Sequence, residues 1–465
     1  MNFNTPKSTS LDFSKWTTVS TRLVKSEGKR EPEWMELSVL DSPMWDGIHS
    51  SYFLLYKSEP GADADDVLPI DRLIGSLGKA LEHFYPFAGR LIKPEKDKAV
   101  RLFCNNEGAP FTHKHFDGVV SDLMDVEQFK SNEILSGLYD VYPAAEVFDA
   151  SGVPTLIIQV TDFKCGTRCL STSWSHNVAD GFSGTHFLAS WAQIARGEPI
   201  SLLPVHNRTL LGPRKSSRVL DGGPCRFLNN IIEEPAVLQL AEPEGGIGGR
   251  SFKLSRRRMN ELKAEALRDS QFGSLSTANC VSAHLWRLIT EKRGHAPHEM
   301  TRFCTLVNCR PRLKDCPAGY FGNCIALVAS PVTVGELLSN SLGHAATIIH
   351  KAIKELNEDV IRDYIDWLSV NKFQWSSVGD EPFMLGDPRS NLHSVQASWH
   401  NWFPFYELDF GGGRPSLALL NGYRVDESYT GVFFPLPTST NSSEGGLNIF
   451  LFGGKNMLGR LDNEL

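Results

Sequence analysis

The sequence predicts an α/β protein of two domains, and three observations support this prediction. The chain has 465 residues, more than a single hydrophobic core usually organises. In both halves, segments with strand-like patterns are interleaved with segments of helical spacing. Between the halves, residues 198–250 are rich in proline and end in a run of glycines, which is typical of a long connection. We therefore expect domains at residues 1–200 and 251–465, joined by a crossover at residues 201–250.

Composition and charge exclude several classes of protein. With 41% apolar and 22% charged residues, the chain is typical of a globular protein. Its net charge of −7 gives no reason to expect nucleic acid as a partner. No apolar run is long enough to span a membrane, and the first residues lack the apolar core of a signal peptide. The nine cysteines lack zinc-site spacing, so we expect free thiols, no metal and a cytoplasmic protein.

The first half is expected to begin with two strands and a helix. Residues 34–57 contain two apolar segments of strand character, with Asp41 and His49 in the connection between them. An ordinary loop would explain this connection as well as a functional one. Apolar residues at helical spacing follow over residues 73–84, and a proline and a glycine after them end the predicted helix.

A histidine stands where a later strand gives way to a helix. Residues 169–176 alternate small and larger side chains, which predicts a buried strand that ends at His176. Helical spacing begins at Gly184 and ends at Gly197. A side chain at such a strand end can face a cleft. A single histidine is nevertheless more often an ordinary polar residue, and Asp180-Gly181 is a common turn.

Basic residues gather at the start of the second half. They are Lys253, Arg256, Arg257, Arg258 and Lys263. They form either a solvated helix face or a site for a phosphate group, because Lys and Arg supply charge-assisted hydrogen-bond donors. Ser276 is expected to cap the next helix, which begins with Thr277.

Two motifs resemble those of the plant BAHD family of coenzyme A-dependent acyltransferases. The segment from His176 to Gly181 is similar to the family's His-x-x-x-Asp motif. The segment Asp409-Phe410-Gly411-Gly412-Gly413 is similar to its Asp-Phe-Gly-Trp-Gly motif. Either motif alone is a weak indication, but both in this order, about 230 residues apart, are specific. The resemblance covers roughly residues 34–455, with further similar segments at residues 81–91, 208–211, 306–312 and 320–323.

The resemblance implies a fold and a reaction. The implied fold has two similar chloramphenicol-acetyltransferase-like domains, with mixed sheets flanked by helices and an active-site channel at their interface. The implied reaction is direct attack of an acceptor on an acyl-CoA thioester, with His176 as the general base. Imidazole suits this role because its unperturbed pKa of about 6.5 leaves it mostly neutral near pH 7. No acyl-enzyme and no permanently bound cofactor are expected, and a Gly-x-Ser-x-Gly elbow is absent.

The resemblance also implies structural residues within the motifs. Asp180 invites a triad in which a carboxylate orients the imidazole, but the resemblance favours a structural carboxylate that is turned away and paired with an arginine. Asp409 is expected to pair with Arg310 or Arg312. The full structural set is Asp180, Gly181, Asp409, Gly411, Gly413, Arg310 and Arg312.

The remaining expected site residues bind substrates. For coenzyme A, including its 3′-phosphate, they are Lys253, Ser255, Arg257 and Thr277. For the acyl group and the acceptor, they are His49, Trp399, His400, Asn401 and Trp402. Gly412 replaces a tryptophan whose indole N–H is thought to help hold the oxyanion in some members. Glycine there implies either a wider space near the thioester carbonyl or a loop rebuilt around a residue without a side chain.

The sequence indicates the acyl donor and the acceptor less directly than it indicates the reaction. Residues 180–187 are most similar to hydroxycinnamoyl transferases, which implies a p-coumaroyl, caffeoyl or feruloyl CoA donor. Members that use shikimate carry an arginine after Ser-Trp, whereas residues 398–404 contain none. The acceptor is therefore open among a less charged alcohol, a phenol, an amine and shikimate. We expect a monomer whose partners are acyl-CoA and a small-molecule acceptor.

Two other functions stay open. Some proteins similar to this family act as partners in lipid elongation and not as transferases. The glycine at position 412 is compatible with this alternative, whereas the intact His176 argues against it. A wax-ester or condensation-type enzyme shares the first motif but not the second.

Overall fold

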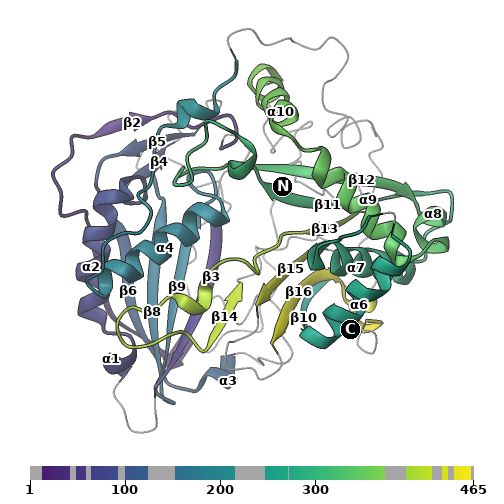
Figure 1. The fold of residues 1–465 in the computed structure, drawn as a ribbon. Helices are drawn as coiled ribbons and strands as arrows, with labels where there is room; N and C mark the ends of the chain where they lie inside the picture. Colours follow the sequence, from purple (N-terminus) through teal and green to yellow (C-terminus); the bar gives the residue numbers. More distant parts are fainter. Residues whose placement is uncertain are drawn as a thin grey trace, which may run out of the picture. The chain divides into compact units, whose positions relative to one another are not determined.

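The computed structural model describes residues 13–461, except residues 42–48, 59–63, 93–99, 124–151, 215–246, 271, 372–393, 421–431 and 438–444. These residues form two compact units (Figure 1). Unit 1 consists of Met1–Arg208, Gly319–Asn323 and Phe403–Tyr423, and unit 2 consists of Thr209–Ala318, Cys324–Trp402 and Arg424–Leu465. Each unit contains a six-stranded mixed sheet with helices, which confirms the predicted α/β class.

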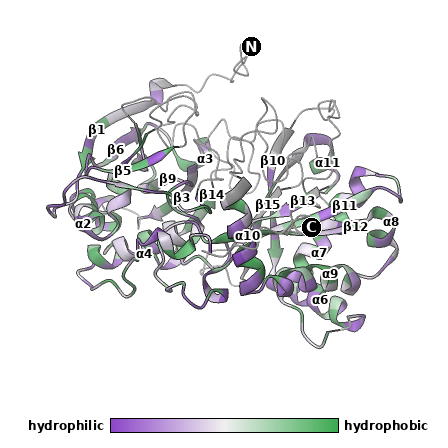
Figure 2. Cartoon of the chain, turned by 90° about the horizontal axis from the view of Figure 1, so that it is seen from above, coloured by the Kyte–Doolittle hydropathy of each residue, from purple (hydrophilic) through white to green (hydrophobic). Residues whose placement is uncertain are grey.

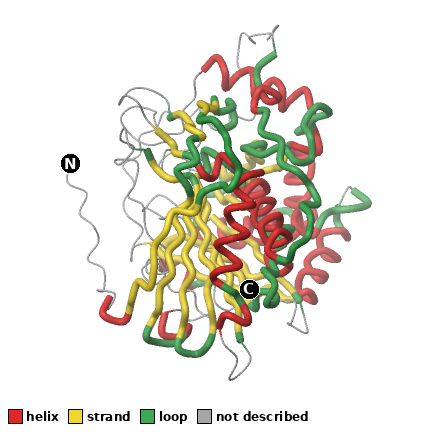
Figure 3. The backbone as a smooth tube through the Cα atoms, turned by 90° about the vertical axis from the view of Figure 1, so that its left-hand side faces the viewer, coloured by secondary structure: helices red, strands yellow, loops and turns green. Residues whose placement is uncertain are grey.

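Unit 1 is built on two sheets, and the strands of the larger one run side by side (Figure 3). Pairing is antiparallel except between β6 and β8. In spatial order the larger sheet has β1 (Trp16–Val24), β6 (Ala109–Phe116), β8 (Leu156–Phe163), β9 (Thr167–Ser175), β3 (His49–Lys57) and β14 (Leu417–Leu420). The smaller sheet has β2 (Glu33–Met35), β5 (Arg101–Cys104), β4 (Arg90–Ile92) and β7 (Val153–Pro154).

The two central strands β3 and β9 position the predicted catalytic histidine. Every residue of β9 is buried, and so are Ser50–Tyr56 of β3, because both faces of these strands are covered. Their register places His49 opposite Ser175, the last residue of β9. The strand predicted over residues 169–176 is therefore present and ends one residue before His176.

Helices α2 (Ile70–His83) and α4 (Gly181–Ala195) pack against each other, and short helices α1 (Ala64–Val67) and α3 (Val120–Leu123) complete unit 1. Gly184 lets α4 approach the sheet closely. A Cβ atom there would lie 2.1 Å from the Trp174 indole ring, so no other residue fits without displacing that buried ring.

Unit 2 is built on one sheet in which β13 runs parallel to both of its neighbours. In spatial order the strands are β10 (Ile247–Ser255), β16 (Gly446–Gly454), β15 (Val432–Pro437), β13 (Ser394–Ala397), β11 (Met300–Asn308) and β12 (Ile325–Thr333). The helices are α6 (Arg256–Arg268), α7 (Thr277–Arg293), α8 (Val334–Ser339), α9 (Leu342–Glu355), α10 (Glu358–Asn371) and α11 (Lys455–Gly459).

Helix α7 lies at the centre of the unit 2 core and contacts both α6 and α9. Figure 2 shows hydrophobic and hydrophilic residues along α6 and α9, as expected for helices with one buried face. The predicted cap of α7 is present as a capping box, in which the Ser276 hydroxyl accepts from the backbone N–H of Asn279 while the Asn279 side chain accepts from the backbone N–H of Ser276.

The observed division differs from the expected domain boundaries in its connectivity. Unit 1 includes Gly319–Asn323 from the second half of the chain, where Tyr320 forms a bridge with Val205. It also includes the segment with the second motif, because β14 after this motif pairs with β3. These additions to unit 1 depend on pairings between distant segments, which local sequence patterns do not specify. Most of the expected crossover lies outside the described residues.

Candidate active site

His176 begins the turn that leads from β9 into α4. The turn is closed by the backbone N–H groups of Val178 and Ala179, which donate to the Ser175 carbonyl at 3.0 and 3.3 Å. Asp180 is the N-cap residue of α4, and its carboxylate accepts from the backbone N–H of Ser183 at 2.9 Å. The motif therefore has a local physical basis: a strand end, a tight turn and a helix cap.

The triad arrangement is not formed in this structure. The Nδ1 atom of His176 has no hydrogen-bond partner among the described residues, so the Asp180 carboxylate does not hold the imidazole through it. Asp180 is buried and serves instead as the cap of α4. This geometry favours the structural role that the resemblance implies for Asp180 over direct orientation of the base.

Buried polar groups hold the backbone of the His176 turn. The Asn323 side-chain amide donates to the His176 carbonyl at 2.6 Å and to the Asp41 carboxylate at 2.8 Å. Arg208 donates to the Val178 carbonyl at 2.9 Å and forms an ion pair with Asp41. The Asp41 and Arg208 side chains are 0% and 4% exposed, so the ion pair is shielded from water. Two carbonyls of the turn are thus fixed through one buried carboxylate.

We call Asp41, Arg208 and Asn323 the Asp41 network. Asp41 accepts two further backbone N–H groups, from Ser38 at 2.8 Å and from Asn323 at 2.8 Å, so each of its carboxylate oxygens has at least two donors. Full satisfaction of this kind is what makes a buried charge tolerable. From the sequence, Asp41 is expected only in the connection between two strands. No sequence pattern assigns Arg208 or Asn323 to the site.

Burial lowers the pKa of both His176 and its neighbour His49. Burial lowers the pKa of His176, and the nearby Asp180 charge opposes this shift only in part. Burial, together with the charge of His176, lowers the pKa of His49 to about 4. His49 Nδ1 lies 3.2 Å from the Ser173 hydroxyl, which in turn lies 2.8 Å from the Ser51 hydroxyl. The structure therefore places His49 near His176, and its role toward a substrate stays a prediction.

The second motif forms a tight loop that is held by other residues of unit 1. The Asp409 carboxylate accepts from the backbone N–H groups of Gly411 at 2.7 Å and of Gly413 at 3.0 Å. Both glycines have positive φ, at +99° and +125°, a conformation that favours glycine. Arg72 donates to the Gly411 carbonyl at 2.9 Å. Asp409 thus builds a turn.

The Asp409 carboxylate bonds to N–H groups of its own loop, and its pairing with Arg310 or Arg312 stays a prediction. Arg312 donates through Nη1 to the carbonyls of Ile353 and Leu356, and Arg310 donates to the side chain of Asn308. The two glycine N–H groups satisfy one oxygen of the Asp409 carboxylate locally. Arg196, from the same unit, donates to the Asp409 carbonyl at 2.5 Å.

Gly412 is packed against backbone and leaves no wide space at its own position. A Cβ atom there would lie 2.3 Å from the Asp66 carbonyl oxygen and 2.4 Å from that of Val67. The loop is therefore built around a residue without a side chain, which is one of the two alternatives that the sequence implies for Gly412. The expected widening near the thioester carbonyl finds no support in this packing.

Gly412→Trp is expected to lower the free energy of unfolding by about 1–3 kcal/mol and to give no faster turnover, because the indole has to displace backbone. Thermal unfolding and kcat are to be measured together. Gly75→Ala is the matched control, since Gly75 lies on α2 with nothing within 4 Å of an added Cβ. An equally stable and faster Gly412→Trp protein would contradict this account.

The other expected substrate residues lie in unit 2 and are engaged locally. The Ser255 hydroxyl caps α6, and the exposed Arg257 pairs with Glu261 at 2.9 Å. Trp399 donates to the Ser282 hydroxyl at 3.1 Å, and His400 lies 2.9 Å from the Ser398 hydroxyl. Trp402 donates to the Trp399 carbonyl at 3.0 Å. The other expected residues here are Lys253, Thr277 and Asn401.

Within the described ranges, no group of three or more His, Cys, Asp and Glu side chains could hold a metal ion. The same part of the chain contains no helix that is long and apolar enough to cross a membrane.

Comparison with known proteins gives the family. The model of the Transferase family matches residues 14–452. A hydroxycinnamoyl-CoA:5-hydroxyanthranilate N-hydroxycinnamoyltransferase from Avena sativa is 32% identical, covering 86% of this chain and 87% of the relative. A shikimate O-hydroxycinnamoyltransferase from Nicotiana tabacum is 30% identical (81% and 83%), and an anthranilate N-benzoyltransferase from Dianthus caryophyllus is 31% identical (87% and 89%).

Solved structures show the same fold at lower identity. Vinorine synthase matches with a TM-score of 0.69 and 19% identity, covering 97% of both chains. TRI101 from F. sporotrichioides, in complex with coenzyme A and T-2, matches with a TM-score of 0.74 and 18% identity, covering 92% of this chain and 97% of that one. The motifs, the fold and the family match agree: the chain belongs to the BAHD transferase family and is an acyltransferase that uses acyl-CoA as its cosubstrate.

Proposed function

We propose that this acyltransferase moves a hydroxycinnamoyl group from its coenzyme A thioester to a hydroxyl or amine acceptor, with His176 as the general base. The observation that carries this proposal is the buried His176 at the end of β9, on a turn held by the Asp41 network. The names of two relatives, which act on hydroxycinnamoyl groups, support the choice of donor.

In the proposed reaction, the neutral imidazole of His176 accepts the proton of the acceptor O–H or N–H group as that atom attacks the thioester carbonyl. The tetrahedral intermediate then collapses, the C–S bond breaks, and the imidazolium returns the proton to the departing coenzyme A thiolate. The products are the acyl ester or amide and free coenzyme A. A positioned base of this kind contributes on the order of 10²–10⁴ in rate.

Burial of His176 has a consequence for the pH profile. The base acts when it is neutral, and burial lowers its pKa below the ordinary value of 6.5. As pH falls, the imidazole therefore stays unprotonated to a lower pH than a free histidine would. For a hydroxyl acceptor, kcat/KM is therefore expected to fall to half of its plateau at a pH below 6.5. Initial rates from pH 5 to 8 check this, and a midpoint above 6.5 would count against His176 as a buried base.

The acceptor is proposed to be a small molecule with a hydroxyl or an aromatic amine group. The relatives that acylate 5-hydroxyanthranilate and anthranilate support an amine, and the relative that acylates shikimate supports a hydroxyl. The test is a screen of p-coumaroyl, caffeoyl, feruloyl and benzoyl CoA against pooled alcohols, phenols and aromatic amines, read by mass spectrometry. Absence of any new ester or amide with the wild-type protein would overturn the proposed function.

We further infer a monomer that works in the cytoplasm. Both motifs lie in one chain, within unit 1, so one copy supplies them. The eight cysteines in the described part of the chain are free thiols, which suits a reducing compartment. Light scattering during size-exclusion chromatography tests the first point, and fractionation of the source tissue tests the second.

A further inference from the structure

Three cysteines lie close together in unit 2. Cys309 directly follows β11, Cys316 comes after the turn at Arg310–Arg312, and Cys324 directly precedes β12. The Sγ atoms of Cys316 and Cys324 are 4.0 Å apart, although the two residues are eight positions apart in the sequence. The backbone N–H of Cys309 donates to the Cys324 carbonyl at 2.8 Å. The fold therefore brings together thiols that come from separate turns of the chain.

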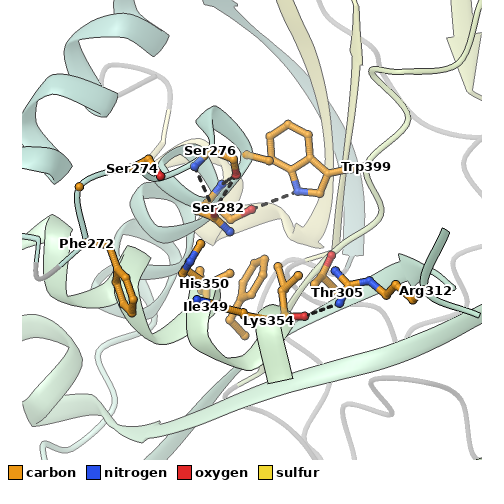
Figure 4. Close-up of a pocket in the computed structure, with 15 residues that line it drawn as sticks. Phe272, Ser274, Ser276, Ser282, Thr305, Arg312, Ile349, His350, Lys354 and Trp399 are labelled. Carbon is orange, nitrogen blue, oxygen red and sulfur yellow. Dashed lines mark hydrogen bonds between the residues drawn. The ribbon is translucent and has the colours of Figure 1, made fainter. Parts of the chain in front are cut away.

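The backbone around both thiols is anchored. Arg312, which lines a cavity of about 830 Å³, precedes Cys316 and reaches toward the end of α9 that carries His350 and Lys354 (Figure 4). There it donates to two carbonyls, at 2.8 and 2.6 Å. The backbone N–H of Cys316 donates to the Leu313 carbonyl at 3.2 Å. Because these bonds hold the approach to Cys316, and the bond from Cys309 holds Cys324, the two sulfur atoms stay neighbours.

The loop between these two cysteines leads to the turn of the general base. Its Gly319 carbonyl accepts from the backbone N–H of Val205 at 2.8 Å. Its last residue, Asn323, donates to the His176 carbonyl at 2.6 Å as part of the Asp41 network. Asn323 is joined to Cys324 by one peptide bond. A change at the Cys324 sulfur is therefore passed on to a residue that fixes the His176 turn.

We propose that Cys316 and Cys324 form a redox-active pair, in which a peroxide converts the two thiols into a reversible disulfide. In the first step, the Cys316 thiol is oxidised to a sulfenic acid while hydrogen peroxide is reduced to one water molecule. In the second step, the Cys324 thiol attacks the Cys316 sulfur, the S–S bond forms and a second water molecule leaves. Two thiols lose two electrons in total, and a dithiol restores them by exchange.

The surroundings of the two thiols favour this order of events. Cys316 is 9% exposed, whereas Cys309 and Cys324 are 0% exposed. The hydrogen bond with Cys316, together with burial, raises the pKa of Cys324 well above its ordinary value. Cys316 therefore reacts first with a small oxidant, and Cys324 is the thiol that closes the disulfide. In a reducing compartment such a pair stays reduced and is oxidised only transiently.

Oxidation is expected to slow the chemical step. A disulfide bond is about 2.05 Å long, so the two sulfur atoms have to approach each other by about 2 Å. This movement shifts Asn323 against the His176 carbonyl. Since a misplacement of about 1 Å can cost up to about 100-fold in rate, we expect the disulfide to lower kcat about tenfold and to leave both KM values unchanged.

The test compares reduced wild-type protein with protein treated with hydrogen peroxide. Chymotrypsin cleaves after aromatic residues such as Tyr320 and Phe321, so after digestion without reductant only a disulfide joins the peptide of Cys316 to that of Cys324. Mass spectrometry is expected to detect this linked pair, and dithiothreitol is expected to remove it and to restore kcat.

Two variants serve as controls. Cys316→Ser is expected to give no linked peptide and to keep its kcat in peroxide. Cys165→Ser removes an exposed thiol elsewhere and is expected to behave as the wild type in both assays. The comparison of oxidised with reduced wild-type protein holds even if a variant fails to fold.

Three results would overturn the proposal. The first is oxidised wild-type protein without the linked peptides, and the second is a disulfide that joins Cys309 in place of Cys316. The third is an equal loss of kcat in wild type and in folded Cys316→Ser, since the loss would then come from another residue. The linked peptides are detected without any substrate. If no acyl-CoA is turned over but they form, the redox-active pair stands while the proposed function fails.

Discussion

Replacing His176 with alanine is expected to lower kcat/KM for acyl transfer by at least about 100-fold, the scale of a lost general base. The protein is expected to stay folded, because the ring is held by no hydrogen bond through Nδ1 and the turn is held through its backbone. The measurement is initial-rate kinetics with the best donor and acceptor pair from the screen, beside circular dichroism of both proteins.

His49→Ala is the matched control for this prediction, since it removes a second histidine from the same surroundings. It is expected to affect KM for a substrate more than it affects the chemical step. Activity of His176→Ala within a few-fold of wild type, in a folded protein, would refute the assignment of the base. The same would follow if His49→Ala gave the larger loss of kcat.

Replacing Asp41 with asparagine is expected to lower the free energy of unfolding by about 3–5 kcal/mol, because it leaves the buried charge of Arg208 without its partner. Asparagine keeps the size of the side chain and one acceptor oxygen. The loss of stability therefore reflects the removed charge and not a change in side-chain volume. Activity is expected to fall with stability, because the carbonyls of His176 and Val178 lose their fixed donors. Thermal and urea unfolding measure the first effect, and kcat at low temperature measures the second.

A double variant keeps this prediction testable. Arg208→Met alone leaves the Asp41 carboxylate without its ion-pair partner, whereas the double variant Asp41→Asn with Arg208→Met removes both charges. The double variant is expected to be more stable than the sum of the single losses implies, as removal of both members of a buried pair costs less than removal of one. Single variants with the wild-type melting temperature would show that the Asp41 network does not hold the turn.

The strand, turn and helix around His176 were predictable because their signals are local. Alternating side chains mark β9, helical spacing marks α4, and Asp180 is a preferred cap residue directly before the helix. The capping box of α7 was foreseen in part from Ser276 for the same reason. In these cases, each residue's neighbours in sequence are also its neighbours in space.

The Asp41 network could not be predicted in this way. Asp41 meets Arg208 across 167 residues and Asn323 across 282 residues, and no periodicity links such positions. The segments with Arg208 and Asn323 were recognised only as similar to parts of the family, without a role. The sequence likewise does not reveal that the Asp409 carboxylate bonds to glycine N–H groups of its own loop.

The central claim is that acyl transfer to an acceptor depends on His176, and one measurement tests it most directly. Free coenzyme A thiol and acylated acceptor are quantified in the same reaction, for wild type and His176→Ala, with a hydroxycinnamoyl CoA and the acceptor found in the screen. The account predicts equal amounts of thiol and acyl product with wild type, and a loss of both by at least about 100-fold with the variant. Acyl product formed by the folded variant at the wild-type rate, or no acyl product from the wild-type protein with any pair, would contradict it.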